Sequence, residues 1–139
     1  MSDSIKTPSH VQWLIALGGW TVFVWFQRIG NVLGDEELAG IARAWRLVVA
    51  VGFVAAGAGL VGAVVAGQRG QSLLGRLASP LGVGLAVVGS VWWILRGGQI
   101  LVGDWDLSFK AVHTVLAVVV VGLSVMVWRT RGYDRPSYG

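Results

Sequence analysis

The feature that most constrains how this chain folds is a set of four long apolar runs, separated by polar breaks, at residues 11–26, 47–67, 81–95 and 111–128. A helix that crosses the hydrocarbon core of a bilayer needs about 20 residues, within a range of roughly 17–25. The second and fourth runs meet this length directly. The first and third reach it with their flanks, at 9–28 and 79–96, if Arg28 and Arg96 extend from the helix ends to the headgroups. The pattern predicts an all-α, polytopic membrane protein with four transmembrane helices.

The composition agrees with a bilayer environment. Hydrophobic residues make up 55% of the chain and charged residues only 13%, whereas a soluble domain averages about 25% charged residues. The absence of cysteine excludes disulfides and thiolate metal sites. The net charge of +4 comes from basic residues scattered at the ends of the apolar runs, not gathered in one patch. We therefore expect membrane lipids as partners and no nucleic acid.

A motif occurs twice in the chain. One copy begins at the end of the first apolar run, and the other begins at the end of the third. Residues 25–38 read W-F-Q-R-I-G-N-V-L-G-D-E-E-L, and residues 93–107 read W-I-L-R-G-G-Q-I-L-V-G-D-W-D-L, with Val102 as the one insertion. The segments that follow also match: R-A-W-R-L-V-V-A-V at 43–51 and K-A-V-H-T-V-L-A-V at 110–118. Two Gly/Val/Leu-rich hairpins can look alike by composition, but Trp, Arg and Asp coinciding in order favours a duplication. Each copy has two spans, an even number, so the copies are predicted to be parallel hairpin repeats.

These observations predict a single membrane domain over residues 1–139. Its predicted parts are repeat 1 at 9–67, a loop at 68–80, repeat 2 at 81–128 and a tail at 129–139. The loop and the tail are basic and largely uncompensated, which places them and both termini in the cytoplasm under the positive-inside rule. The predicted location is the cell inner membrane, as a multi-pass protein. Tryptophans near the two Gly-Asp loops are expected to form an aromatic belt at the outer interface; they are Trp25, Trp45, Trp92, Trp93 and Trp105.

Arg28 and Arg96 are the first candidates for a binding site, because each lies shortly before a loop carboxylate, Asp35 or Asp104. One interpretation is a pair of arginine sites for an anionic headgroup or solute, since the guanidinium fork binds phosphate and carboxylate bidentately. The other, which we favour, is that each arginine pairs with its own loop acid and anchors a helix end.

Further polar residues accompany these charges. The amides of Asn31 and Gln99 are expected to satisfy backbone groups where each helix ends, and they complete the candidate ligand site. Gly34-Asp35 and Gly103-Asp104 predict turns whose aspartate caps the following helix.

His113 is the only histidine inside an apolar run, and an ionisable group in a membrane suggests a function such as proton relay or haem ligation. It lies close to Lys110, and thus near the outer interface, while His10 lies near the opposite face, so no pair of haem-ligating histidines forms within one chain. The sequence contains no phosphate-binding loop, zinc-protease motif or nucleophile elbow. We expect no enzymatic activity, no cofactor and no metal.

Small residues predict how the helices pack. In lipid, helices associate by close backbone approach rather than by hydrophobic burial. The second apolar run is therefore expected at the centre of the bundle. The predicted packing residues are Gly52, Ala55, Gly59, Gly62, Ala63, Ala66, Gly82 and Ala86.

The second copy resembles a family of very small two-helix membrane proteins from actinobacteria. The resemblance rests on W-W-x-x-R at 92–96, the Gly-Asp loop, and F-K-A-V-H-T-V-L-A-V-V-V-V-G at 109–122. It covers the C-terminal half; the first copy is similar through W-x-x-R-I-x-N-x-L-x-D but has Arg46 where the histidine falls. The family has no assigned function, so the resemblance implies a lineage in which two hairpins fused.

Three functions follow as expectations. The leading one is a non-enzymatic accessory or stabilising subunit of a larger membrane complex, or a homo-oligomer. The alternative is a small transporter or channel with an anion- or headgroup-binding outer mouth. The third is a haem or quinone protein that uses His113.

Overall fold

The computed structural model describes residues 9–131, which form helices and short connections without any strand in that range. The helices are α1 (His10–Gly34), α2 (Gly40–Gln68), α3 (Ser72–Val102) and α4 (Leu107–Thr130). The prediction of an all-α protein is confirmed. Most of the expected tail at 129–139 lies outside the described residues.

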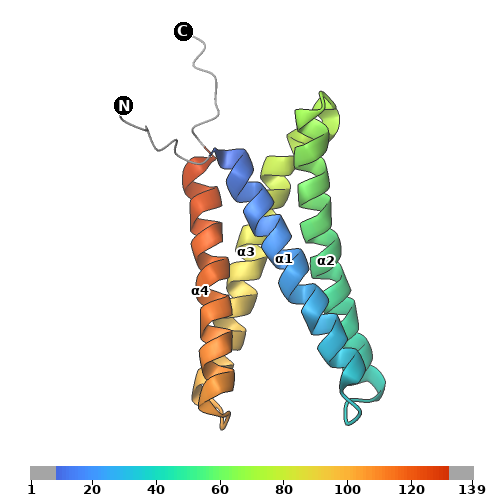
Figure 1. Cartoon of the computed structure of the whole chain (residues 1–139), viewed down its shortest axis with the longest axis vertical. Coiled ribbons are helices and arrows are strands. Elements are labelled where there is room, and N and C mark those ends of the chain that lie inside the picture. Colours follow the sequence, from blue (N-terminus) through green and yellow to red (C-terminus); the bar gives the residue numbers. More distant parts are fainter. Residues whose placement is uncertain (1–8, 132–139) are drawn as a thin grey trace, which may run out of the picture.

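The helices form two hairpins, α1–α2 and α3–α4, that lie side by side (Figure 1). Residues 35–39 and 103–106 close the hairpins at one end of the molecule, which we call the Gly-Asp end. The start of α1, the end of α4 and the connection at 69–71 lie at the other end, which we call the terminal end. The hairpins approach each other toward the terminal end and diverge toward the Gly-Asp end (Figure 1).

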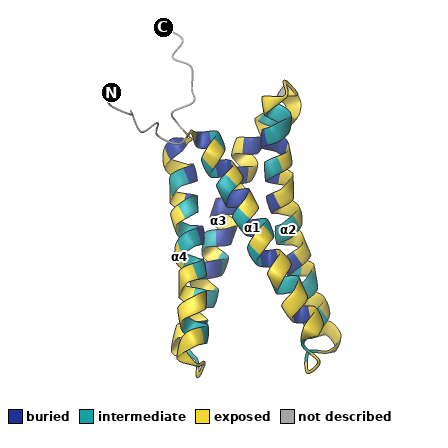
Figure 2. Ribbon diagram, viewed as in Figure 1, coloured by how far each residue is buried: buried dark blue, intermediate teal, exposed yellow. Residues whose placement is uncertain are grey.

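Three helical segments are long and apolar enough to cross a membrane: Gly40–Gln68, Leu73–Val102 and Leu107–Thr130. Exposed residues make up much of these helices (Figure 2), and apolar residues such as Val48, Val87 and Val115 are among the exposed ones. Soluble monomers rarely expose large contiguous apolar patches. The chain therefore has the character of a membrane protein.

A compact core holds the terminal half together. Its buried members are Leu14, Leu17, Leu60, Ala63, Val64, Ala78, Leu85, Ala86 and Val127. Close backbone contacts join the helices at glycines. A Cβ on Gly18 would lie 2.9 Å from the Gly57 carbonyl oxygen, and a Cβ on Gly75 would lie 2.7 Å from the Gly67 Cα. Such contacts are the means by which helices associate in lipid.

A buried hydrogen bond ties the first helix to the last. The Thr130 hydroxyl donates to the Met126 carbonyl oxygen (2.8 Å), so His10 Nδ1–H donates to Thr130 Oγ1 (2.9 Å). This bond closes the bundle at the terminal end.

The packing face of α2 differs from the expectation. Gly52, Ala55, Gly59 and Gly62 are exposed, and a Cβ on any of the three glycines would meet nothing within 4 Å. Among the described residues α2 contacts α1 and α3 but not α4, so it does not lie at the centre and one of its faces is left outside. The other expected packing residues are less exposed: Ala63, Gly82 and Ala86 are buried, and Ala66 is half-buried.

Helix boundaries also differ from the expectation. The predicted loop at 68–80 is wrong beyond residue 71, because α3 already begins at Ser72 and contains Pro80. Arg28 and Arg96 do not end their helices, which continue to Gly34 and Val102. The apolar residues that follow each arginine sustain the helix for about two further turns.

The aspartates that were predicted to cap the helices do not do so. The carboxylate of Asp106, not Asp104, caps α4 by accepting a hydrogen bond from the Phe109 N–H (2.8 Å). Hydrogen bonds from the Ser108 hydroxyl and the Phe109 N–H lower the pKa of Asp106. At the start of α2 the capping position is Ala39, so Asp35 does not cap that helix, and Gly40 takes a positive φ of 61°.

Candidate functional site

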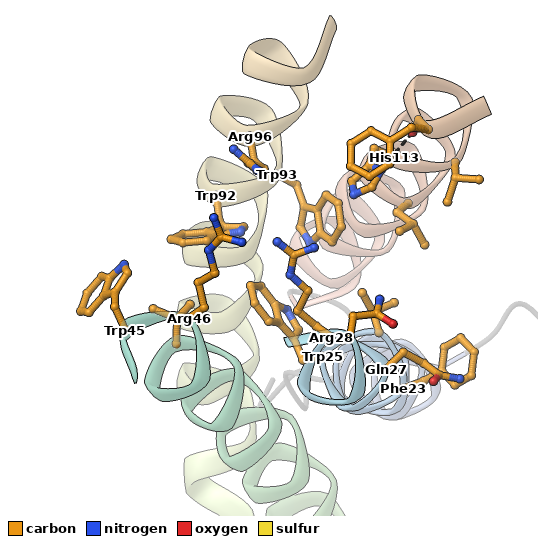
Figure 3. A pocket seen from close by; sticks show the side chains of 16 residues that line it. Phe23, Trp25, Gln27, Arg28, Trp45, Arg46, Trp92, Trp93, Arg96 and His113 are labelled. Atoms are coloured by element: carbon orange, nitrogen blue, oxygen red, sulfur yellow. Dashed lines mark hydrogen bonds between the residues drawn. The ribbon is translucent and has the colours of Figure 1, made fainter. Parts of the chain in front are cut away.

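A cavity of about 300 Å³ lies between the two hairpins in the Gly-Asp half of the molecule (Figure 3). All four helices contribute to its lining. Its volume falls at the lower end of the range for small-molecule sites, roughly 300–1,000 Å³.

Four basic side chains, one from each helix, line this cavity at a common level. They are Arg28, Arg46, Arg96 and His113, which we call the basic layer. Each lies six residues from the Gly-Asp end of its helix, where the end residues are Gly34, Gly40, Val102 and Leu107. At 1.5 Å per residue, this level is about 9 Å from the helix ends.

The positive charge of the basic layer is not neutralised by the protein. Arg28 is half-buried, and the charges of Arg96 and Arg46 act on it unfavourably. No aspartate or glutamate lines the cavity. Within residues 9–131, Arg28 and Arg46 form no ion pair, and Arg96 only donates to the Gln99 side-chain oxygen at 3.3 Å. Like charges that act on one another disfavour the charged form, and an anion between them would relieve this repulsion.

The arginines therefore do not pair with the loop acids, contrary to the interpretation favoured from the sequence. Asp35 lies seven residues after Arg28, which places it about 10 Å further along the helix axis. No ion pair joins Arg28 to Asp35 or Arg96 to Asp104 within residues 9–131, and both arginine side chains line the cavity instead.

His113 presents one ring nitrogen to a defined partner. Its Nδ1–H donates to the Phe109 carbonyl oxygen at 2.9 Å, because a carbonyl can only accept. Its ring packs against Phe109 at 4.0 Å and Trp93 at 6.3 Å between centroids. In this tautomer Nε2 is left as a hydrogen-bond acceptor.

A second, apolar layer lies deeper in the cavity. It consists of Trp25, Val49, Trp93 and Leu116, which we call the apolar floor. Each lies nine residues from the Gly-Asp end of its helix, about 14 Å along the axis.

Aromatic contacts hold the floor. Trp25 stacks on Phe53 at 4.2 Å between ring centroids, and Trp92 meets the edges of both rings at 5.7 and 6.0 Å. Trp25 and Trp93 are only 6% and 7% exposed. They therefore line the cavity rather than stand in a lipid-facing belt.

The structure brings some of the predicted site residues together and not others. Arg28, Asn31, Arg96 and His113 line the cavity, whereas Asp35, Gln99 and Asp104 do not, although Gln99 accepts from Arg96. The sequence interpretation missed Arg46, Gln27 and the aromatic walls. One signal for Arg46 was present, because it occupies the position that His113 holds in the second copy of the motif.

No protein-family model, curated protein or solved structure matches the chain. The resemblance noted for residues 109–122 thus gains no relative from these comparisons. Among residues 9–131, no group of three or more His, Asp or Glu side chains is placed to hold a metal ion. The candidate site is accordingly defined by its own geometry: a basic layer above an apolar floor.

Proposed function

We propose that the chain spans the membrane four times, with α1 as the fourth span. α1 packs against α2 at Gly18 and Gly57. It also covers the same height as α4, because His10 bonds Thr130 at the terminal end while Arg28 and His113 share the cavity at the other. A helix packed over this height lies at the same membrane depth as its neighbours. The polar residues of α1 near Arg28, which are Gln27 and Asn31, line the cavity and so need not contact lipid.

We further propose that both termini are cytoplasmic and that the membrane is the cell inner membrane. The basic residues at 69–76 and 129–131 support this orientation. Because the chain has no cysteine, single cysteines at two exposed serines give a clean test. A membrane-impermeant maleimide on intact cells stripped of their outer layers should label Ser108→Cys directly and Ser9→Cys only after permeabilisation. Labelling in the reverse order would contradict the orientation.

The lining of the cavity supports an origin by duplication. Matched positions of the two motif copies face it in pairs from corresponding helices. These pairs are Trp25/Trp93, Arg28/Arg96, Trp45/Val112, Arg46/His113 and Val49/Leu116. Parallel repeats related by an axis along the membrane normal produce such a lining.

We infer that the protein binds an anion in this cavity. The cavity would be the binding site at the Gly-Asp end of a small transporter or channel. The observation that carries this inference is the basic layer: three guanidinium groups from three helices meet in one cavity with no acid in its lining. Arginine suits this role, because its planar fork donates two parallel hydrogen bonds to phosphate or carboxylate.

Thermal stability measured with added anions tests this function. Tryptophan fluorescence reports unfolding in neutral detergent, and phosphate should raise the unfolding temperature of the wild type by mass action. Arg28→Gln, Arg46→Gln and Arg96→Gln should each reduce that rise, whereas Arg129→Gln, which lies at the terminal end, should retain it. Equal stabilisation of all four variants would refute binding in the cavity. Flux into liposomes with and without Arg28→Ala and Arg96→Ala then tests transport.

The second candidate is a non-enzymatic accessory subunit or homo-oligomer. The outward face of α2 supports it, because Gly52, Ala55, Gly59 and Gly62 present small residues to the surrounding lipid. Cross-linking after purification in mild detergent tests this candidate. A protein that stays monomeric and without partners would exclude it and would leave the anion-binding function unaffected.

A further inference from the structure

The cavity has two chemically different levels, and a simple inorganic anion uses only one of them. The basic layer lies about 9 Å from the helix ends, and the apolar floor lies about 5 Å deeper. A phosphate ion at the basic layer would leave the half-buried side chains of Val49 and Leu116 in the floor uncovered. A ligand with an apolar part would cover this surface, and removing apolar surface from water is favourable.

We propose that the ligand is an amphiphile with a phosphate headgroup, held with the phosphate at the basic layer and the beginning of its apolar tail on the apolar floor. This inference rests on the proposed anion-binding function and names the class of anion.

The charge of the basic layer favours phosphate over carboxylate. A phosphate monoester carries about −1.5 to −2 charges at pH 7 and three acceptor oxygens. It can therefore accept from Arg28, Arg46 and Arg96 together, whereas a carboxylate brings a single charge and would leave part of the arginine charge uncompensated. With Nδ1–H bonded to the Phe109 carbonyl oxygen, His113 adds Nε2 as a further hydrogen-bonding atom in the cavity lining.

The order of the two layers matches a lipid in the leaflet on the Gly-Asp side. The charged groups lie toward the helix ends, where headgroups gather, and the floor lies toward the middle of the helices. A volume of about 300 Å³ suits a headgroup and the first carbon atoms of a tail rather than a whole two-chain lipid. The remainder of the tail would lie in the surrounding bilayer.

Tryptophan fluorescence titrations of the wild type in a neutral maltoside detergent test this inference with three probes at one ionic strength. The probes are dihexanoyl phosphatidate, dihexanoyl phosphatidylcholine and inorganic phosphate. Dihexanoyl phosphatidate should bind at least about tenfold more tightly than either of the others, since burial of two methylene groups corresponds to roughly a tenfold gain.

The three probes separate the two proposals. Equal affinity for dihexanoyl phosphatidate and inorganic phosphate would overturn the amphiphile and leave the anion-binding function standing. Equal affinity for the two dihexanoyl lipids, with no binding of inorganic phosphate, would overturn both. Saturable phosphate binding that weakens in Arg28→Gln, together with preference for the phosphatidate, supports both.

A variant of the floor gives a matched control. Leu116→Trp fills the floor without altering a charge, whereas Val118→Trp makes the same kind of change on the exposed face of α4, two residues away. Leu116→Trp should weaken dihexanoyl phosphatidate about tenfold, the loss expected for a tail of two buried methylenes, and leave inorganic phosphate unchanged; Val118→Trp should affect neither. Unchanged phosphatidate affinity in a folded Leu116→Trp would overturn the inference. If that variant does not fold, the wild-type comparison of the three probes still decides.

Discussion

The substitution Gly57→Ala, which adds one methyl group, should force α1 and α2 further apart. A Cβ at this position would lie 2.8 Å from the Gly18 carbonyl oxygen, 3.1 Å from Val22 Cγ2 and 3.2 Å from Thr21 Cβ. Favourable contacts between carbon atoms lie at about 3.5–4.0 Å. The shortest contact is to backbone, which cannot rotate out of the way, so the whole of α1 has to shift.

The magnitude follows from two opposing effects. Inserting a methyl group into a tightly packed core typically costs about 1–3 kcal/mol, and replacing a helical glycine by alanine gains about 0.5–1 kcal/mol. Gly57→Ala should therefore lower the free energy of unfolding by about 1 kcal/mol, and by at most about 2.5 kcal/mol. Gly59→Ala is the matched control, because a Cβ there would meet nothing within 4 Å. It should leave the free energy of unfolding unchanged or raise it by up to about 1 kcal/mol.

Unfolding in mixed micelles with increasing dodecyl sulfate, followed by tryptophan fluorescence, measures both variants. The midpoint should fall for Gly57→Ala and not for Gly59→Ala. Equal midpoints, or a larger fall for Gly59→Ala, would show that α2 turns its other face to α1 and would refute the packing described above.

Two further predictions concern the helix ends. The lowered pKa of Asp106 means that its cap is complete above the ordinary aspartate pKa of about 3.9 and is lost as the pH falls through the lower folded value. In the wild type, exchange protection of the Phe109 amide should therefore persist at about pH 4 and be lost only at lower pH. It should be absent at all pH values in Asp106→Ala and unchanged in Asp104→Ala; protection that survives in Asp106→Ala would contradict the cap. Thr130→Val removes the acceptor of the buried His10 hydrogen bond and should cost about 1–3 kcal/mol. Thr114→Val, whose exposed hydroxyl bonds only the Lys110 carbonyl of its own helix, should cost clearly less, and equal losses would contradict the tie between α1 and α4.

Much of the fold could be predicted from the sequence, because apolar runs and polar breaks directly report helices and their connections. The ends of the helices were harder to predict. At Arg28 the apolar run stops but the helix does not, because Ile29, Val32 and Leu33 continue the helical pattern to Gly34. The polar residues there face a cavity, and hydropathy alone cannot distinguish a cavity-facing residue from a helix end.

The packing face of α2 shows a different limit. This helix carries small and apolar residues on every side, so periodicity does not distinguish the face that meets α1 from the face that meets lipid. Gly57 packs and Gly59 does not, although the two are alike in sequence. Only the arrangement of the hairpins separates them.

About half of the candidate site could be predicted from the sequence. Arg28, Asn31, Arg96 and His113 were singled out as rare polar residues near the ends of apolar runs, and all line the cavity. Their meeting was not predictable, because it depends on how two hairpins diverge. Arg46 was missed for a related reason: it follows a loop directly, where a basic residue needs no special explanation.

Isothermal titration calorimetry with inorganic phosphate tests most directly whether the basic layer binds one anion. The wild type should bind one phosphate per chain, and the affinity should fall with added salt. Arg28→Gln should weaken binding about 10- to 100-fold, as expected for a lost hydrogen bond between charged groups, while Arg129→Gln should bind as the wild type does. Absence of saturable binding, or equal affinity in Arg28→Gln and Arg129→Gln, would contradict anion binding by the basic layer.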